Sequence, residues 1–322
     1  MSGTAPVDDT SSGGDSGLVD GILNIDKPAD ITSMDVVRRV KRASGHKRVG
    51  HGGTLDPIAT GVIPICMGQA TRMMEYLIEG TKEYRGSVEL GVETDTYDAV
   101  GKVTKKIDPS HVTLRDVESA LPSFRGTIQQ VPPMYSALKR QGRRLYELAR
   151  AGIHVERSPR RVEVLSVEIL DWSPPIVELQ ITCGRGFYMR SLAHDLGQSL
   201  GCGGHMKNLV RQRSGPFHIS EALSLKELEQ RFAGGTWRES LYAPDQVVRH
   251  MRTVIVGRPL EELIRQRRYL PIGLRIPFSR PDEQCRVYGT DGRFIAIMSF
   301  NASKGLWQRS RVFSLRYEQR EY

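Results

Sequence analysis

The stretch Gly50-His51-Gly52-Gly53-Thr54-Leu55-Asp56-Pro57 places three glycines, one imidazole and one carboxylate within eight residues. Glycine lets a backbone approach a ligand closely and adopt positive φ angles. Pro57 restricts Asp56 to an extended conformation and so fixes the direction of its side chain. The pattern predicts a loop that presents one acid into a cleft. Turn chemistry alone also allows a surface turn with a helix-capping aspartate, so the surrounding sequence has to decide.

Periodicity outside the loop predicts an α+β fold. Apolar residues at helical spacing predict one helix after Ser33, its expected N-cap, and another from Met189 to Leu200 that ends at Gly201. Strand-like alternation or β propensity marks the segments Tyr84–Gly91, Arg161–Leu170 and Ile176–Cys183. Because strands and helices interleave without a βαβ rhythm, we expect a mixed, largely antiparallel sheet flanked by helices.

The sequence divides into three parts. Residues 1–20 hold four aspartates and no Lys or Arg, which predicts a disordered acidic tail. Residues 21–240 form the main domain, and a linker is expected near residues 236–244. Residues 245–322 predict a small β-rich domain with a basic helix, Pro259–Arg268, and three strands, Gln284–Tyr288, Arg293–Phe300 and Trp307–Tyr317.

Composition narrows the class of protein. The net charge of +9 and the pI near 9.5 favour an anionic partner. The four cysteines show no CxxC pairing, which predicts free thiols in a reducing compartment and argues against a zinc site or a disulfide framework. No stretch approaches the ~18 apolar residues of a membrane span, and no signal peptide is recognisable. We therefore expect a cytoplasmic protein without a membrane partner.

Eight motifs follow one another in a fixed order: Gly21–Pro28, Gly50–Pro57, Ala59–Gly68, Lys82–Arg85, Gln130–Lys139, Gly186–Arg190, Gly201–Met206 and Leu209–Arg211. In this order they resemble the TruB-type tRNA pseudouridine synthases. The resemblance implies that one uridine in the T loop of tRNA, U55, is isomerised to pseudouridine. It also implies a catalytic main domain of the pseudouridine-synthase fold, and a PUA-like C-terminal domain. A small accessory β domain remains the alternative for the latter.

The isomerisation breaks the N1–C1′ bond and joins the same base through C5, so it requires no redox cofactor and no metal. The resemblance assigns the reaction to Asp56, by attack on C1′ or by removal of the C2′ proton. It assigns Arg190 to an ion pair that keeps Asp56 charged. It assigns Tyr84 to stacking on the flipped uracil, with its hydroxyl near C5. Taken alone, Arg190 would read as a helix-surface arginine.

Further positions come from the same resemblance. Tyr188 and Leu209 match residues that line the uridine pocket, although a leucine is ordinarily part of a core. His51 matches a histidine that positions the T loop. Lys27 is expected to support the cleft, with a structural salt bridge as the alternative. Phosphate contacts are expected from basic residues of the helix after Ser33 and from a later basic group: Arg38, Arg39, Lys41, Arg42, Lys139, Arg140, Arg143, Arg144, Arg157, Arg160 and Arg161.

Three other functions remain open. A nucleotide-binding enzyme would cradle phosphate in the glycine loop, but the Gly-Lys-Ser/Thr ending of a P-loop is missing and Asp56 would repel phosphate. A non-catalytic RNA-binding protein would use the same basic surface. A guide-RNA-dependent relative would need partners, whereas one catalytic block with a small C-terminal piece favours a monomer with tRNA as its partner and no obligatory protein partner.

Overall fold

The computed structural model describes residues 18–136, 138–140, 142–153, 155–266 and 280–316. Most of the expected acidic tail, residues 1–17, therefore lies outside the described residues. The same holds for the predicted end of the basic helix at Arg267 and Arg268, and for Tyr317 at the end of the last predicted strand.

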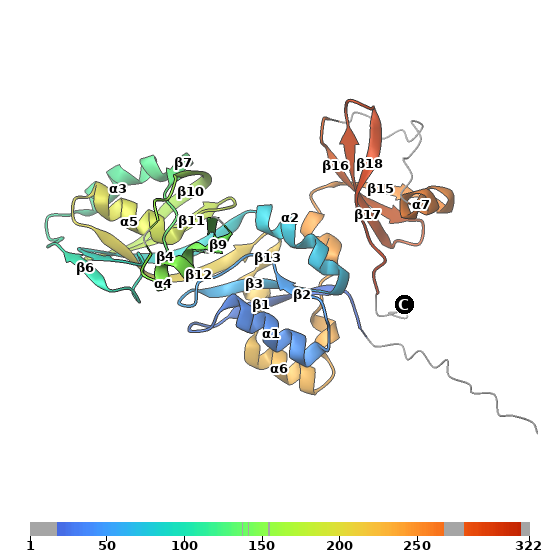
Figure 1. Cartoon of the computed structure of the whole chain (residues 1–322), viewed down its shortest axis with the longest axis horizontal. Helices are drawn as coiled ribbons and strands as arrows, with labels where there is room; N and C mark the ends of the chain where they lie inside the picture. Colours follow the sequence, from blue (N-terminus) through green and yellow to red (C-terminus); the bar gives the residue numbers. More distant parts are fainter. Residues whose placement is uncertain (1–17, 137, 141, 154, 267–279, 317–322) are drawn as a thin grey trace, which may run out of the picture.

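A ten-stranded mixed sheet forms the centre of the molecule (Figure 1). Its main path runs through β14 (Leu223–Ser224), β1 (Gly21–Lys27), β3 (Thr60–Met67), β12 (Gly204–Ser214), β4 (Lys82–Leu90), β11 (Ile176–Cys183), β10 (Arg160–Ser173) and β7 (Gly126–Gln130). The short strands β2 (Val49–His51) and β13 (Phe217–His218) pair with β3 and β12. Only the β1–β14 and β3–β12 pairs of this sheet are parallel. The predicted mixed, largely antiparallel α+β fold is confirmed.

Helices cover the sheet at separate places. On one half, α1 (Ser33–Ser44) and α6 (Leu225–Ala233) contact each other, and α6 also contacts β1 (Figure 1). On the other half, α5 (Met189–Ser199) packs against β12 and β4. The remaining helices and short β pairs are η1 (Gly68–Met73), α2 (Met74–Glu79), α3 (Leu114–Ala120), η2 (Leu121–Phe124), α4 (Leu145–Arg150), η3 (Ile219–Glu221), η4 (Trp237–Ser240), η5 (Pro244–Val248), β5 (Val92–Thr94) with β6 (Val103–Lys106), and β8 (Lys139–Arg140) with β9 (Arg143–Arg144). None of the helices in the described ranges is long and apolar enough to cross a membrane.

The strand alternation of β1 sends its side chains into two different cores. Leu23 and Ile25 are fully buried in the large core between the sheet and the helices of the main domain. Ile22 points the other way, into a second cluster that reaches Phe294 and Phe313 of the C-terminal part of the chain. Because successive strand residues face opposite sides, this one strand links the main domain to the C-terminal part.

The start of α1 differs from the prediction by one residue. Thr32 is the N-cap, and its side chain accepts a hydrogen bond from Asp35 N while the Asp35 carboxylate accepts one from Thr32 N. This reciprocal pair is a capping box. Ser33, the predicted cap, is the first helical residue, and its hydroxyl bonds to the backbone of Leu55 instead. The expected valine stripe of this helix is buried.

The C-terminal part forms a four-stranded sheet of β15 (Arg252–Val256), β16 (Gln284–Gly289), β17 (Phe294–Asn301) and β18 (Leu306–Val312), with the helix α7 (Arg258–Arg265). Three strands and the helix agree with the prediction. The first strand, β15, was not predicted. It pairs in parallel with β16 and leaves Ile255 largely exposed, so its sequence lacks a clear buried face.

The expected linker near residues 236–244 is instead part of the packed structure. Trp237 is buried against Phe232 and the ring of His46. Just beyond the segment, Val247 and Val248 are buried in the second cluster. Packing therefore continues across the predicted boundary, and we keep 21–240 and 245–322 only as proposed domain limits.

Asp20 lies in the expected tail, yet it is buried where three segments meet. Its carboxylate accepts hydrogen bonds from Gln69 N at 2.7 Å and from Arg316 N at 2.8 Å. Its own backbone N–H donates to Arg316 O at 3.0 Å. Asp20 thus ties the N-terminal segment to η1 and to the end of the C-terminal domain, and the predicted disorder does not extend to this residue.

We expect Asp20→Ala to lower the free energy of unfolding by about 2–4 kcal/mol, because two backbone N–H groups would lose a charged acceptor in a buried position. Urea unfolding followed by fluorescence measures the change. Glu168→Ala, which removes an exposed carboxylate on β10, is the control and is expected to change stability by less than about 0.5 kcal/mol. Equal midpoints for the two variants would contradict this role of Asp20.

Candidate active site

The glycines of the loop after β2 are required by the protein's own packing. A Cβ on Gly50 would lie 2.6 Å from Met74 Sδ, and one on Gly52 would lie 2.5 Å from Leu77 Cδ1. Both neighbours belong to α2, so the close approach expected for a ligand is made to this helix instead. Gly53 has φ +141°, a conformation that favours glycine.

The polar groups of the loop backbone are largely used within the protein. Gly52 N donates to Pro64 O, Gly53 N to His51 Nδ1 and Leu55 N to Ser33 Oγ. Loop amides that already have partners do not form an open nest for phosphate. The nucleotide-binding alternative therefore loses the feature on which it depended.

Arg211 on β12 holds the loop backbone in place through hydrogen bonds. Its side chain is 1% exposed, and it donates to Val62 O at 2.6 Å, Gly53 O at 3.1 Å and Thr54 O at 3.4 Å. A buried guanidinium is tolerated when carbonyl acceptors satisfy its donors. Arg211 therefore fixes the backbone that leads into Asp56.

Asp56 lies opposite Arg190, the second residue of α5. Arg190 Nε is 2.9 Å from Asp56 Oδ2, and Arg190 Nη2 donates to Asp56 Oδ1 at 3.0 Å. This two-pronged arrangement suits the planar guanidinium better than it would suit a lysine. The Arg190 side chain is 3% exposed and that of Asp56 is 31% exposed. The predicted ion pair is present, and one edge of the carboxylate stays accessible.

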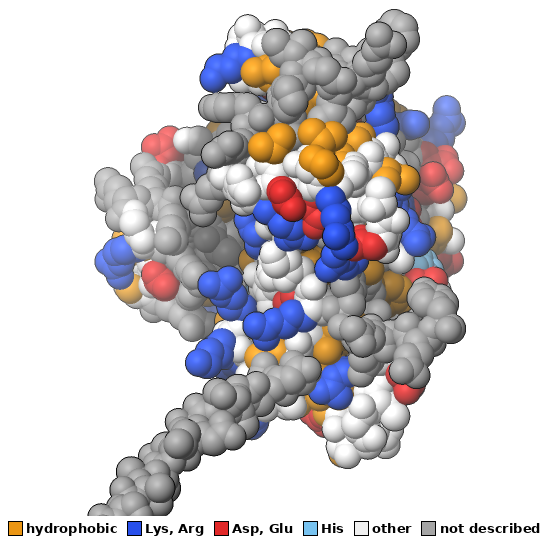
Figure 2. All heavy atoms as spheres, turned by 90° about the vertical axis from the view of Figure 1, so that its right-hand side faces the viewer, with side chains coloured by type: hydrophobic (Ala, Val, Ile, Leu, Met, Phe, Trp, Pro, Cys, Tyr) orange, Lys and Arg blue, Asp and Glu red, His pale blue; other side chains and the backbone are white. Residues whose placement is uncertain are grey.

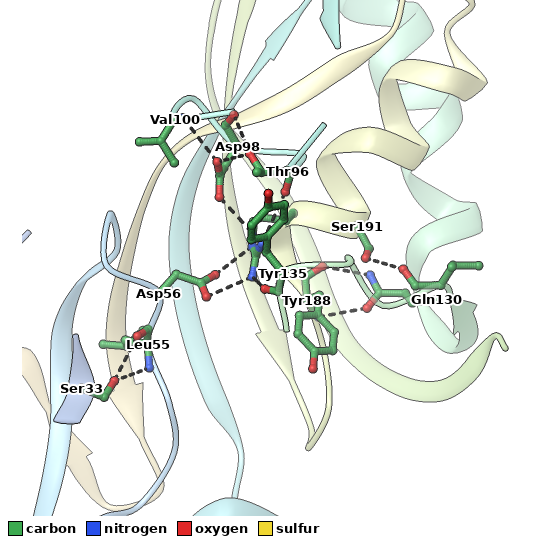
Figure 3. Close-up of polar contacts among 12 residues, drawn as sticks. Ser33, Leu55, Asp56, Thr96, Asp98, Val100, Gln130, Tyr135, Tyr188 and Ser191 are labelled. Carbon is green, nitrogen blue, oxygen red and sulfur yellow. Dashed lines mark hydrogen bonds and ion pairs between the residues drawn. The ribbon is translucent and has the colours of Figure 1, made fainter. Parts of the chain in front are cut away.

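Further acceptors surround the guanidinium of Arg190. Nη2 donates to Tyr135 O at 2.8 Å and Nη1 donates to Thr96 O at 3.4 Å. Nη1 also lies 3.8 Å from Asp98 Oδ2. Figure 3 shows Asp56 reaching toward this group from the loop, while Thr96, Asp98 and Tyr135 lie on the other side. These contacts fix the guanidinium in one orientation.

Burial raises the pKa of the Asp56 carboxyl above its usual value, Arg190 opposes this shift, and the negative charge of Asp98 adds to it. The Asp56 side chain is nevertheless 31% exposed, so water still reaches part of the carboxylate. Lys27 contributes a smaller opposing effect on the same pKa.

Tyr84 lies on β4 directly opposite Arg211 of β12. Its ring centroid is 6.3 Å from that of Phe187, with the planes tilted by 33°. Burial raises the pKa of the Tyr84 hydroxyl, and the Arg211 charge partly opposes this shift. The hydroxyl is therefore protonated at neutral pH, which makes it a hydrogen-bond donor.

Tyr188 immediately precedes α5 and is held by the side-chain amide of Gln130. Gln130 Oε1 accepts from Tyr188 N at 3.0 Å, and Gln130 Nε2 donates to Tyr188 O at 3.2 Å. Burial raises the pKa of Tyr188, while Ser136 and Arg190 lower it. Figure 3 shows Tyr188 between Gln130 and the Asp56 recess.

Lys27 is fully buried and does not reach solvent. Its ammonium group donates to Pro28 O at 2.7 Å, Ile31 O at 2.9 Å and Pro57 O at 3.1 Å. Burial lowers the pKa of Lys27 to about 8. The residue therefore supports the loop from within. Among the described residues it forms no salt bridge, which was the alternative to this supporting role. We propose a positioning role for it in place of contact with RNA.

His51 and Leu209 occupy different surroundings. His51 Nδ1 accepts from Gly53 N at 3.3 Å, and burial lowers the pKa of His51, so the ring is neutral with its proton on Nε2. Leu209 is 6% exposed and belongs to the large core, where a Cβ on Gly86 would meet its Cδ1 at 3.0 Å. Its geometry is that of a packing residue beside the recess.

From the sequence, no site role was predicted for several residues that build this site, although Ser33 was singled out as a helix cap. Ser33 and Arg211 fix the loop, Asp98 faces Arg190, and Gln130 fixes Tyr188. Arg211 and Gln130 were named only as members of sequence motifs, without a role. The sequence around a buried polar side chain does not indicate which distant group it will bind. Among the described residues, no group of three or more His, Cys, Asp or Glu could hold a metal ion. All four cysteines are buried free thiols.

Comparison with known proteins agrees with this geometry. Residues 41–189 match the model of the TruB family pseudouridylate synthase N-terminal domain, and residues 190–264 match that of the tRNA pseudouridylate synthase B C-terminal domain. A tRNA pseudouridine synthase B of Dehalococcoides mccartyi strain 195 is 43% identical over 296 residues, which covers 92% of this chain and 97% of that protein. The chain belongs to the TruB family. It is thus a pseudouridine synthase, an isomerase, as the sequence predicted.

Other TruB family members and solved structures extend the comparison. A tRNA pseudouridine synthase B of Symbiobacterium thermophilum is 51% identical over 213 residues, 65% of this chain and 71% of that protein. The crystal structure of a Cbf5-Nop10-Gar1 complex aligns with a TM-score of 0.68 at 24% identity, covering 92% of this chain and 84% of that chain. At this identity the structural likeness supports the fold alone.

We expect Arg211→Met to lower the free energy of unfolding by about 2–4 kcal/mol and to reduce kcat, because the carbonyls of Val62, Gly53 and Thr54 would lose their donor. Arg213→Met on the same strand is the matched control. Arg213 is partly exposed and paired with Glu83, so its loss is expected to cost less than about 1 kcal/mol. Urea unfolding and single-turnover rates measure both effects, and indistinguishable behaviour of the two variants would contradict the role of Arg211.

Proposed function

We propose that this TruB family enzyme isomerises U55 in the T loop of tRNA to pseudouridine. The observation that carries the proposal is the ion pair between the buried Arg190 and the partly exposed Asp56. The curated relatives from Dehalococcoides mccartyi and Symbiobacterium thermophilum are tRNA pseudouridine synthases B, and they support tRNA as the substrate. The net charge of +9 suits a polyanion.

Asp56 acts in the reaction as a carboxylate. It either attacks C1′ of the ribose or removes the C2′ proton, and in both cases the N1–C1′ bond breaks and the base leaves. The detached uracil then turns so that C5 forms the new bond to C1′. In the first route the Asp56 carboxylate leaves C1′ as this bond forms, and in the second route Asp56 returns the proton to C2′. The C5 proton is then lost and N1 is protonated. Arg190 stabilises the carboxylate whenever it is ionised and holds it in one orientation.

Two tyrosines receive the base in this proposal. The Tyr84 ring stacks on the flipped uracil, since aromatic faces bind extruded bases without reading their sequence. Its protonated hydroxyl donates a hydrogen bond. The hydroxyl can relay the C5 proton only after it has given up its own proton. Tyr188, fixed by Gln130, forms the adjoining wall of the uridine pocket, together with Leu209.

The target uridine must leave its stack to reach Asp56, which costs a few kcal/mol. Contacts with the rest of the T loop offset this cost. In our proposal the neutral His51 contributes by donating from Nε2 to the RNA. The basic residues of α1 and of the β8–β9 hairpin contact phosphates, which positions the RNA without reading its sequence. We further propose that the protein acts as a monomer without a guide RNA, and turnover of purified tRNA by the protein alone tests this.

We expect Asp56→Ala to bind tRNA with its original affinity but to lose at least about 10⁴-fold in rate, the size typical for a group that takes part in bond breaking. The measurements are filter binding and the release of tritium from uridine labelled at C5. Asp108→Ala, an exposed aspartate outside the site, serves as the control with full activity. Turnover by Asp56→Ala would remove the enzymatic role of this residue, and mapping of the modified nucleotide tests U55.

The pH dependence follows from the raised pKa of Asp56. Because the reaction needs the anion, kcat/KM should fall with slope one as pH decreases, with a midpoint above the usual value of 3.8. Asp98 raises this pKa, so Asp98→Asn should move the midpoint to lower pH. Glu168→Gln should leave it in place. A midpoint that does not respond to Asp98→Asn would show that another group controls the acidic limb.

A further inference from the structure

Four arginines, here called the junction cluster, gather where the C-terminal domain meets the main domain. Arg48 and Arg72 come from the main domain, and Arg309 and Arg311 come from β18. Burial lowers the pKa of Arg72, and the charges of Arg311, Arg48 and Arg309 lower it further. The Arg48 carbonyl accepts a hydrogen bond from Gly68 N, the first residue of the helix η1 that carries Arg72. Arg309 lies two residues before Arg311, which pairs with Glu75 of the main domain.

Direct contacts hold two of these side chains in place. The Arg72 guanidinium lies 5.3 Å from the centroid of the Phe313 ring and donates to Val312 O. The Arg311 guanidinium lies 5.7 Å from the centroid of the Tyr76 ring and pairs with Glu75. Both pairs cross the boundary between the domains, so the cluster exists only when the two domains are docked.

The cluster carries more positive charge than its surroundings neutralise. Within the part of the chain that the structure describes, no carboxylate lies within ion-pair distance of Arg48, Arg72 or Arg309; Glu75 pairs with Arg311 alone. Arg48 and Arg309 are exposed. Gathering like charges is unfavourable by itself, and an anionic ligand relieves it. Figure 2 looks at this end of the molecule and shows Lys and Arg side chains between the C-terminal domain at the top and the body below.

The cluster lies at the far end of β3 from the reacting carboxylate. β3 starts at Thr60, four residues after Asp56, and ends at Met67, which pairs with Val49. Arg48 immediately precedes Val49, and its carbonyl accepts a hydrogen bond from Gly68 N. An eight-residue strand spans about 25 Å, so a ligand that contacts both places must extend well beyond the nucleotide bound at Asp56.

We propose that the junction cluster binds backbone phosphates of the tRNA stems outside the T arm while the T loop occupies the Asp56 recess. This inference rests on the proposed function. A guanidinium fork matches a phosphate in two-pronged geometry, and double-stranded RNA is recognised chiefly through its backbone. RNA fits better than an acidic protein segment, because the aromatic rings that such a partner would use as anchors are already covered by Arg72 and Arg311.

The test uses the full-length protein with the double variant Arg48→Ala/Arg309→Ala. Among the residues that the structure describes, neither side chain has a partner in an ion pair or hydrogen bond, so the fold should be retained. Dissociation constants are measured at several KCl concentrations for whole tRNA and for an isolated T-arm hairpin. We expect whole tRNA to bind about tenfold more weakly and its salt slope to fall by about 1.5, as the loss of two phosphate contacts requires. Hairpin binding should be unchanged.

Arg125→Ala removes one exposed arginine next to η2, away from the junction, and should alter neither RNA. An unchanged affinity and salt slope for whole tRNA would overturn the proposal, as would an equal loss for the hairpin. If the double variant lost binding to polyglutamate but bound tRNA normally, the cluster would be assigned to an acidic protein segment, and the proposal would be overturned as well. Pseudouridine formation at saturating tRNA should match the parent. If the parent protein itself formed no pseudouridine, the proposed function would be refuted, and not the role of the junction cluster.

Discussion

The ion pair between Asp56 and Arg190 connects the two halves of the sheet. Asp56 lies in the loop between β2 and β3 on one half, whereas Arg190 is the second residue of α5, which packs on β12 and β4. Arg190 is nearly inaccessible, so its charge depends on Asp56 and on nearby carbonyls. Leaving such a group without its partner typically costs about 3–5 kcal/mol. Under the proposed mechanism the same pair serves both stability and chemistry, which constrains every element that carries either residue.

Two buried cations stabilise the catalytic loop from opposite sides. Lys27 donates to three carbonyls around Pro57, and Arg211 donates to Gly53, Thr54 and Val62. Carbonyl acceptors satisfy these donors without neutralising their charge, so positive potential remains beneath the loop. Lys27 therefore favours the ionised form of Asp56, in the same sense as Arg190.

The sequence predicted most of what depends on local periodicity. The alternation of Ile176–Cys183 reproduces β11 without error. The family resemblance, and not periodicity, paired Asp56 with Arg190 although 134 residues separate them. Features that depend on distant partners were missed. Asp20 has a tail-like composition but accepts bonds from residues far along the chain, and nothing near Arg211 indicates which carbonyls it binds.

The short helix α2 has a consequence for any attempt to shorten this protein. Leu77 of this helix packs against Gly52 of the loop that carries Asp56, and Glu75 of the same helix pairs with Arg311 of the C-terminal domain. Leu77 also shares a core with Phe294 and Phe313. Truncation before β16 would uncover that apolar surface next to the loop. The main domain alone would then be prone to aggregation, and its catalytic loop would lose the backing of a firmly seated helix.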